Sequence, residues 1–83
     1  MINISLKINC KELVKGLLEG EYELPDGATV GDAWQTAQRE SGVALPDSVK
    51  NSVAFLLNSR SADFDSHLGD GDKIRILQKI MGG

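Results

Sequence analysis

Residues 24–34 read LPDGATVGDAW, and the interpretation of the whole chain starts from this stretch. The Pro-Asp-Gly at 25–27 is a strong turn signal, because proline presets φ and glycine tolerates positive φ. Thr29 can cap a helix with its hydroxyl, and Asp32 stands three positions later, where a capping box places an acid. The stretch therefore predicts a strand that ends at Leu24, a tight turn, and the start of a helix.

The helix that follows this turn is amphipathic. Its apolar side recurs at helical spacing and consists of Val30, Ala33, Trp34, Ala37 and Ser41. Trp34 is the largest of these side chains, so we expect it to anchor the helix in the core. Gly42 ends the helix, and we expect Val43 to pack back on the last turn.

Strand patterns flank the helix on both sides. Residues 2–8 (INISLKI) alternate strictly between apolar and polar, which predicts a strand with one buried face. Residues 10–20 are ambiguous, and residues 44–52 form a connector with one helical turn after Pro46. Further strands are predicted at 21–24, 53–57, 62–64 and 73–80. One helix that covers one face of a four- or five-stranded sheet gives an α+β two-layer domain.

Composition limits the classes of protein to which the chain can belong. Its 83 residues suffice for one domain with a small core and little room for an interior active site. A net charge of −3, from 9 basic and 12 acidic residues, argues against nucleic-acid binding. A single cysteine and the lack of a membrane-length apolar run favour a soluble cytoplasmic protein without membrane association.

The sequence does not bring together groups for catalysis or metal binding. His67 has no second histidine to share a metal, so we expect a solvated loop residue. Cys10 has no evident base or cation beside it and is expected to be a small buried hydrophobe. Asp70 and Asp72 lack the ligand pattern of a calcium loop and are better explained by a tight turn around Gly71. We therefore expect no metal site and no bound cofactor.

The last strand predicts a docking surface. Its inner face would carry Ile74, Ile76 and Ile80, whereas Lys73, Arg75, Leu77 and Lys79 would face outward, and Leu56 would point away from Phe55 and Leu57. An apolar patch rimmed with positive charge is typical of docking surfaces, although single exposed leucines are also common. The candidate partner-binding residues are Leu56, Arg75, Leu77, Lys79 and Met81.

The sequence ends in Met81-Gly82-Gly83. Glycine lacks Cβ, so such a tail can lie extended in a narrow slot, and a terminal segment without anchors is mobile. We expect residues 81–83 to form a flexible tail that presents the Gly83 carboxylate to another protein. From these residues alone, a terminus without function is an equally good explanation.

Together these segments resemble the ThiS/MoaD family of small sulfur carriers, which share the β-grasp fold with ubiquitin. The resemblance spans most of the chain. It rests on the alternating first strand, the LPDGATV of residues 24–30, residues 53–58, Leu68 with the Asp70-Gly71-Asp72 turn, and Gly82-Gly83. It implies a β-grasp domain over residues 1–80, with a mixed sheet and one main helix.

The resemblance also implies a carrier and not an enzyme. An adenylating enzyme of the ubiquitin-activating type would use ATP to adenylate the Gly83 carboxylate, and a sulfur donor protein would displace AMP to leave a thiocarboxylate. Gly82 would supply flexibility to the tail. A synthase large subunit or another sulfur-accepting enzyme would then take the sulfur.

The receiving pathway stays open between two types. The length of the chain favours a molybdopterin-type carrier, whereas the Gln78-x-Ile80 ending favours a thiamine-type carrier, and a carrier for another sulfur metabolite or a tungsten-enzyme pathway is a further option. Two other functions compete with the carrier. One is a ubiquitin-like modifier joined through Gly83 to lysines of target proteins, and the other is a β-grasp interaction module whose tail has no role.

Overall fold

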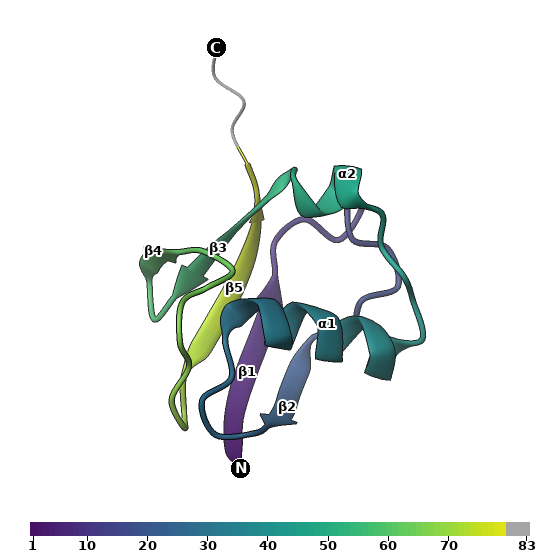
Figure 1. Ribbon diagram of the computed structural model, residues 1–83. Coiled ribbons are helices and arrows are strands. Elements are labelled where there is room, and N and C mark those ends of the chain that lie inside the picture. The colour runs from purple at the N-terminus through teal and green to yellow at the C-terminus, as the bar shows by residue number, and fades with distance from the viewer. Residues whose placement is uncertain (80–83) are drawn as a thin grey trace.

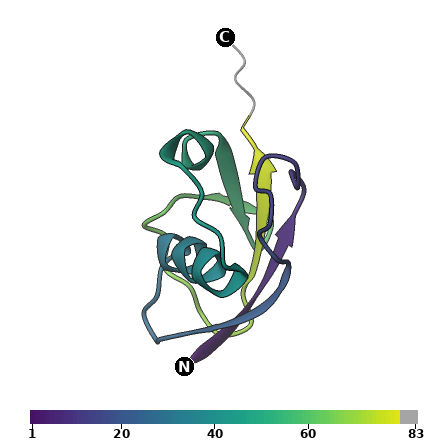
Figure 2. The same ribbon diagram turned by 90° about the vertical axis from the view of Figure 1, so that its right-hand side faces the viewer.

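Two layers make up the molecule, as Figures 1 and 2 show: a five-stranded sheet and a helical layer on one face of it. The structure is a computed structural model that describes residues 1–79. Its elements in chain order are β1 (Ile2–Ile8), β2 (Gly20–Leu24), α1 (Val30–Ser41), α2 (Asp47–Lys50), β3 (Val53–Leu57), β4 (Arg60–Ala62) and β5 (Lys73–Gln78). The α+β architecture with one main helix on a mixed sheet is confirmed.

The sheet has the strand order β2-β1-β5-β3-β4. Its first and last strands in the sequence, β1 and β5, are parallel neighbours, and every other pair is antiparallel. Ile76 of β5 pairs with Ile8 of β1 on one side and with Phe55 of β3 on the other. The strand that leads toward residues 80–83 therefore lies in the middle of the sheet.

Helix α1 has the two ends that the sequence predicts. The Thr29 hydroxyl oxygen accepts the Asp32 backbone N–H at 3.2 Å, and the Asp32 carboxylate accepts the Thr29 N–H at 3.0 Å. This capping box satisfies two of the helix's free N–H groups. Gly42 ends the helix in a left-handed conformation with φ 73°, as expected, and Val43 packs against the core cluster.

The start of α1 is also bound to the loop that follows β4. Val30 donates its N–H to the Ser66 carbonyl at 2.9 Å, and Gly31 donates to the Phe64 carbonyl at 2.9 Å. A Cβ on Gly31 would lie 3.1 Å from the Phe64 oxygen, so this close approach favours glycine. The chain must leave the sheet to make these contacts, which places the loop against the helix.

This contact explains why the predicted edge strand at 62–64 is wrong in position. The strand β4 runs from Arg60 to Ala62, because Phe64 turns away toward α1. Asn58 and Ser59 both have positive φ, at 52° and 70°, and form the turn between β3 and β4. A two-residue turn with two positive φ values matches the twist of a hairpin.

Residues 10–19 are neither helix nor strand. The segment closes one end of the core with Val14 and Leu17, which are both buried. The Glu19 carboxylate accepts the Ile8 N–H at 2.8 Å, and this hydrogen bond is the main reason that the pKa of Glu19 is lowered. Strand β2 then begins at Gly20, one residue earlier than predicted.

Two other expectations concern the connector before β3 and the end of β5. The connector does form one helical turn after Pro46, which is α2. The last strand is shorter than the predicted 73–80, since β5 ends at Gln78, and the Lys79 N–H donates to the Ser52 carbonyl at 2.7 Å. Ile80 lies outside the described residues. Neither helix in residues 1–79 has the length or the apolar run needed to cross a bilayer.

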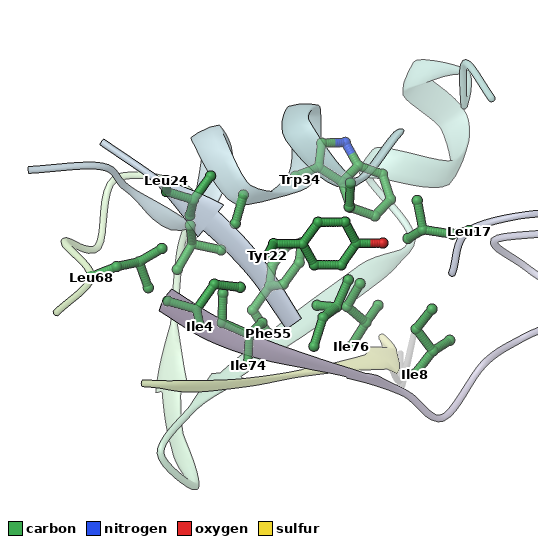
Figure 3. Packing of buried hydrophobic residues seen from close by; sticks show 14 of the residues in the cluster. Ile4, Ile8, Leu17, Tyr22, Leu24, Trp34, Phe55, Leu68, Ile74 and Ile76 are labelled. Atoms are coloured by element: carbon green, nitrogen blue, oxygen red, sulfur yellow. The ribbon is translucent and has the colours of Figure 1, made fainter. Parts of the chain in front are cut away.

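The core fills the space between α1 and the inner face of the sheet (Figure 3). Trp34 is 5% exposed, and its ring meets those of Phe55 and Phe64 edge-on at centroid distances of 5.8 and 6.5 Å. Edge-to-face aromatic pairs add stabilisation beyond the area that they bury. Trp34 is therefore the core anchor that its position in the sequence predicts, and it also joins the helix to the sheet and to the loop after β4.

We predict that Trp34→Ala destabilises the protein by about 3–5 kcal/mol, because it removes a large buried ring and leaves a cavity among three elements. Thermal and urea unfolding followed by circular dichroism would measure the change. Gln35→Ala, at an exposed position of the same helix, is the control and should change stability by less than ~0.5 kcal/mol. Equal melting temperatures for the two variants would contradict the packing described here.

Candidate partner-binding surface

Helix α1 covers only one face of the sheet, and the opposite face is free of other elements in Figure 2. Along β5, Ile74 and Ile76 are buried, Arg75 between them is exposed, and Leu77 is half-buried. This alternation places Arg75 and Leu77 on the uncovered face. We call this face the outer face, and its side chains in the three central strands are Asn3, Ser5, Lys7, Ala54, Leu56, Lys73, Arg75 and Leu77.

The pairing of β3 with β5 brings the predicted leucines together. Leu56 pairs with Arg75, and Ala54 pairs with Leu77, so the two leucines lie diagonally across adjacent strands. Leu57 packs against the core, whereas Leu56 and Leu77 are not among the residues that do so. The structure thus places Leu56, Arg75 and Leu77 on one face, with the two leucines only partly covered.

The remaining predicted site residues lie beyond the sheet. Lys79 is exposed and follows the end of β5, so it is not part of the strand's outward row as the sequence suggested. Met81, Gly82 and Gly83 lie outside the described residues. The structure therefore brings together three of the five candidate partner-binding residues and leaves Lys79 at the border of the surface.

A shallow hollow of about 370 Å³ lies on the outer face beside the leucines. Its lining comes from three strands and the β3–β4 turn and consists of Ser5, Lys7, Leu56, Asn58, Ser59, Lys73, Ile74 and Arg75. We call it the basic hollow, because Lys7, Lys73 and Arg75 supply three positive charges. Sequence reasoning had placed Lys73 on the outer face without making it a binding residue, and it had missed Lys7.

Lys7 could not be found from the sequence pattern, because its place depends on which strands are neighbours. It occupies an ordinary polar position of the alternating first strand. Only the parallel pairing of β1 with β5 puts Lys7 opposite Arg75. Pairings between strands that are far apart in the sequence leave no local signal in either strand.

Hydrogen bonds from side chains hold the edge of the basic hollow. One Asp72 carboxylate oxygen accepts the Asn58 side-chain N–H at 2.9 Å, and the other accepts the Gly69 N–H at 2.7 Å. The Asn58 side-chain oxygen in turn accepts the Lys73 N–H at 3.0 Å. The Asp-Gly-Asp segment is therefore a turn, as predicted, and it ties the β3–β4 hairpin to the start of β5.

Cys10 and His67 lie apart from this surface and from each other. Cys10 is buried, as expected; its Sγ lies 3.8 Å from the Ile76 carbonyl, and burial raises the pKa of its thiol. A raised pKa keeps the thiol protonated and weakens it as a nucleophile. His67 is an exposed loop residue whose Nδ1 lies 3.3 Å from the Gly27 carbonyl. Within residues 1–79, no three histidine, cysteine or acidic side chains are grouped as a metal site.

Three of the solved structures with a similar fold are archaeal proteins. A putative molybdopterin converting factor, subunit 1, from Pyrococcus furiosus is 21% identical, with 96% of this chain and 100% of that chain covered and a TM-score of 0.73. The small archaeal modifier protein 1 of Haloferax volcanii is 16% identical, with coverages of 96% and 100% and a TM-score of 0.72. A ubiquitin of Caldiarchaeum subterraneum is 18% identical, with coverages of 99% and 98% and a TM-score of 0.60.

These likenesses show the fold, and the ubiquitin-like β-grasp expected from the sequence is therefore confirmed. A separate match is to the ThiS family and covers residues 9–83, which is most of the chain. That range includes α1, all strands after β1, and the terminal glycines. The chain therefore belongs to the ThiS family.

Proposed function

We propose that this protein is a sulfur carrier whose Gly83 carboxylate is adenylated by a partner enzyme and converted to a thiocarboxylate for cofactor biosynthesis. The observation that carries the proposal is the family match, which runs through residue 83 and so includes Gly82 and Gly83. The outer sheet face carries two half-covered leucines, and one of them, Leu77, lies on the strand that leads toward these glycines. This arrangement is consistent with a docking partner.

The chemistry asks nothing of the carrier except its terminal carboxylate. A carboxylate is a poor electrophile, so the partner enzyme first lets a Gly83 oxygen attack the α-phosphorus of ATP, and pyrophosphate leaves. Sulfide sulfur then attacks the carbonyl carbon of the acyl adenylate, and the bond to the AMP oxygen breaks. The products are AMP and a thiocarboxylate, whose sulfur is a nucleophile for the next enzyme.

This division of labour suits the side chains of the described residues. The buried thiol of Cys10 and the isolated imidazole of His67 have no arrangement for acid–base or nucleophilic work. In the proposal the partner enzyme binds ATP, and the carrier binds no cofactor of its own. Gly82 gives the tail the narrow profile that an enclosed active site requires.

The proposed partners are the adenylating enzyme, a sulfur donor protein and an acceptor of the sulfur, all in the cytoplasm. The acceptor is the large subunit of a molybdopterin-type synthase or a thiamine-type enzyme. Leu56, Arg75 and Leu77 would contact the adenylating enzyme on the outer face, and Lys79 and Met81 are further candidate contacts. Most of the binding energy of such interfaces comes from a few central side chains, for which we propose Leu56 and Leu77.

The competing proposal is a protein modifier, in which a lysine amine of a target attacks the acyl adenylate to form an amide. The fold likeness to a protein named as a modifier, at 16% identity, is the observation that favours it. Both proposals share the adenylation step and differ in the nucleophile that follows. The third alternative, an interaction module with an inert tail, lacks that step altogether.

We predict that Gly83 acquires sulfur when the protein is incubated with ATP, sodium sulfide and a cognate adenylating enzyme of the ubiquitin-activating type. Intact mass spectrometry should show replacement of one oxygen by sulfur, and fragmentation should place the sulfur at the C-terminal residue. The control is a variant with one alanine added after Gly83, in which the carboxylate no longer follows the two glycines. It should acquire no sulfur.

Other results, in this experiment or in tests with cell extract and cells, would count against the carrier. Failure of the native protein to form either an adenylate or a thiocarboxylate would rule against adenylation. An adenylate that gives amide-linked conjugates in cell extract, but no thiocarboxylate with sulfide, would favour the modifier. Unchanged cellular function of the alanine-extended variant would favour the inert module.

We also predict that Leu77→Ala weakens binding to the adenylating enzyme about 5- to 30-fold, which corresponds to ~1–2 kcal/mol. The melting temperature should change little, because Leu77 does not pack against the core. Leu77→Asp should abolish binding, since docking would bury an unpaired carboxylate. Isothermal titration calorimetry and thermal unfolding would measure the two effects separately.

The matched control for Leu77 is Leu18→Ala. Leu18 is 59% exposed and lies in the segment between β1 and β2, off the outer face. This variant removes the same side chain and should leave both binding and stability close to the native values. Strong destabilisation by Leu77→Ala together with normal binding would contradict the assignment of Leu77 to the docking surface.

A further inference from the structure

Three cations gather on the outer face, and none of them forms an ion pair in direct contact with a carboxylate in residues 1–79. Lys7, Lys73 and Arg75 line the basic hollow, and all three are exposed. The ion pairs within residues 1–79 are those of the Met1 amino group with Asp26 and of Lys11 with Glu19. The chain carries a net charge of −3, so this concentration of positive charge runs against the charge of the whole molecule.

The positions of these cations are unfavourable for the sheet itself. Lys7 and Arg75 occupy directly paired positions of β1 and β5, and like charges opposite each other destabilise a sheet. The Asp72 carboxylate lies next to Lys73 in the sequence, but its oxygens accept hydrogen bonds from Asn58 and Gly69. The charge of Lys7 also helps to lower the pKa of Glu19, so the fold offsets that one charge in part. No such contact is found in residues 1–79 for Lys73 and Arg75, and a negatively charged ligand would compensate them.

Across the sheet, the charges and apolar groups form an ordered series. Glu21 and Glu23 on β2 pair with Ser5 and Asn3 of β1 and lie at the acidic edge of the outer face. The cations follow on β1 and β5. Leu56 on β3 and Leu77 on β5 lie beyond and beside them. A ligand that matches this series has an apolar segment over the leucines and acidic groups over the cations, on the side toward β2.

Building on the sulfur-carrier function, we propose that the basic hollow receives an acidic segment of the adenylating enzyme, next to an apolar segment that covers Leu56 and Leu77. In this proposal Lys7, Lys73 and Arg75 set the rate and the orientation of association. The two leucines set the rate of dissociation. A small anion in the hollow would leave Leu77 uncovered, because Leu77 lies outside the lining, and this favours a protein segment that extends beyond the hollow.

If the cations control association and the leucines control dissociation, the effects of charge on the binding rate can be stated in advance. Exposed charges act over roughly 8–10 Å at ordinary salt concentrations, and complementary patches raise association rates by about 10- to 1,000-fold. Charges at an interface mainly change the association rate and its dependence on salt, whereas most other interface changes act on dissociation. Reversing one cation should therefore slow binding at low salt and matter little at high salt.

The test compares Arg75→Glu with Arg39→Glu. Both variants change the net charge equally, but Arg39 lies on α1, on the opposite side of the sheet. Association with the adenylating enzyme would be followed by stopped-flow fluorescence without ATP, from low salt to above 0.5 M. We expect Arg75→Glu to slow association about 10-fold at low salt, and Arg39→Glu to leave it within about 2-fold of the native rate.

A measurement of folding separates this effect from simple damage to the protein. Arg75→Glu replaces a like-charge pair with a Lys7–Glu pair across the strands, so its melting temperature should equal or exceed that of the native protein. Slower association by a variant that is at least as stable places the defect in binding. A marked loss of stability would contradict the account of the cations given above.

Several outcomes would overturn the proposal. They are equal association rates for the two variants, a native rate that does not depend on salt, and no binding to the enzyme. Saturable binding of AMP or inorganic phosphate to the hollow, detected by amide chemical shifts, with a salt-independent enzyme interaction, would instead indicate a small-anion site. Thiocarboxylate formation by the native protein at saturating enzyme is scored separately, so the carrier function can stand when this inference fails.

Discussion

The structure depends above all on the pairing of the first strand with the last. β1 and β5 are parallel neighbours at the centre of the sheet, and Ile8 lies beside Ile76 at their junction. A parallel pair requires a crossover, and here the crossover contains α1, which packs on only one face. Because β5 is central, the strand that leads toward the terminal glycines is supported on both sides by hydrogen-bonded neighbours.

Features that depend on a few adjacent residues could be predicted from the sequence. Thr29 and Asp32 form the expected capping box, and Gly42 ends the helix in the expected conformation. Features that depend on distant partners could not be predicted. Phe64 leaves the sheet because its carbonyl binds Gly31, so the edge strand lies at Arg60–Ala62 and not at the predicted 62–64. Leu56 and Leu77 could be predicted because alternation along a strand shows which face of the sheet a residue occupies. Lys7 was missed because alternation does not show which strand lies beside it.

The two faces of the sheet carry different constraints. The inner face contributes isoleucines that are almost fully buried against Trp34 and α1, so changes there act on stability. The outer face carries side chains that are exposed or half-buried and lie outside the core cluster. This separation lets the outer surface vary without loss of the fold.

Recognition cannot come from the tail alone if the proposed function is right. Two glycines offer a partner only backbone atoms and a carboxylate, which many chains could provide. The specific information then lies in the outer face, where an acidic edge, a basic centre and two leucines follow one another across the strands. Because the rest of the chain is acidic, an acidic partner would be repelled in most orientations and attracted in the one that faces the basic hollow. The pairing of Lys7 with Arg75 then lowers the stability of the sheet but favours one orientation of the partner. In that orientation the partner lies against β5, the strand that precedes Gly82 and Gly83.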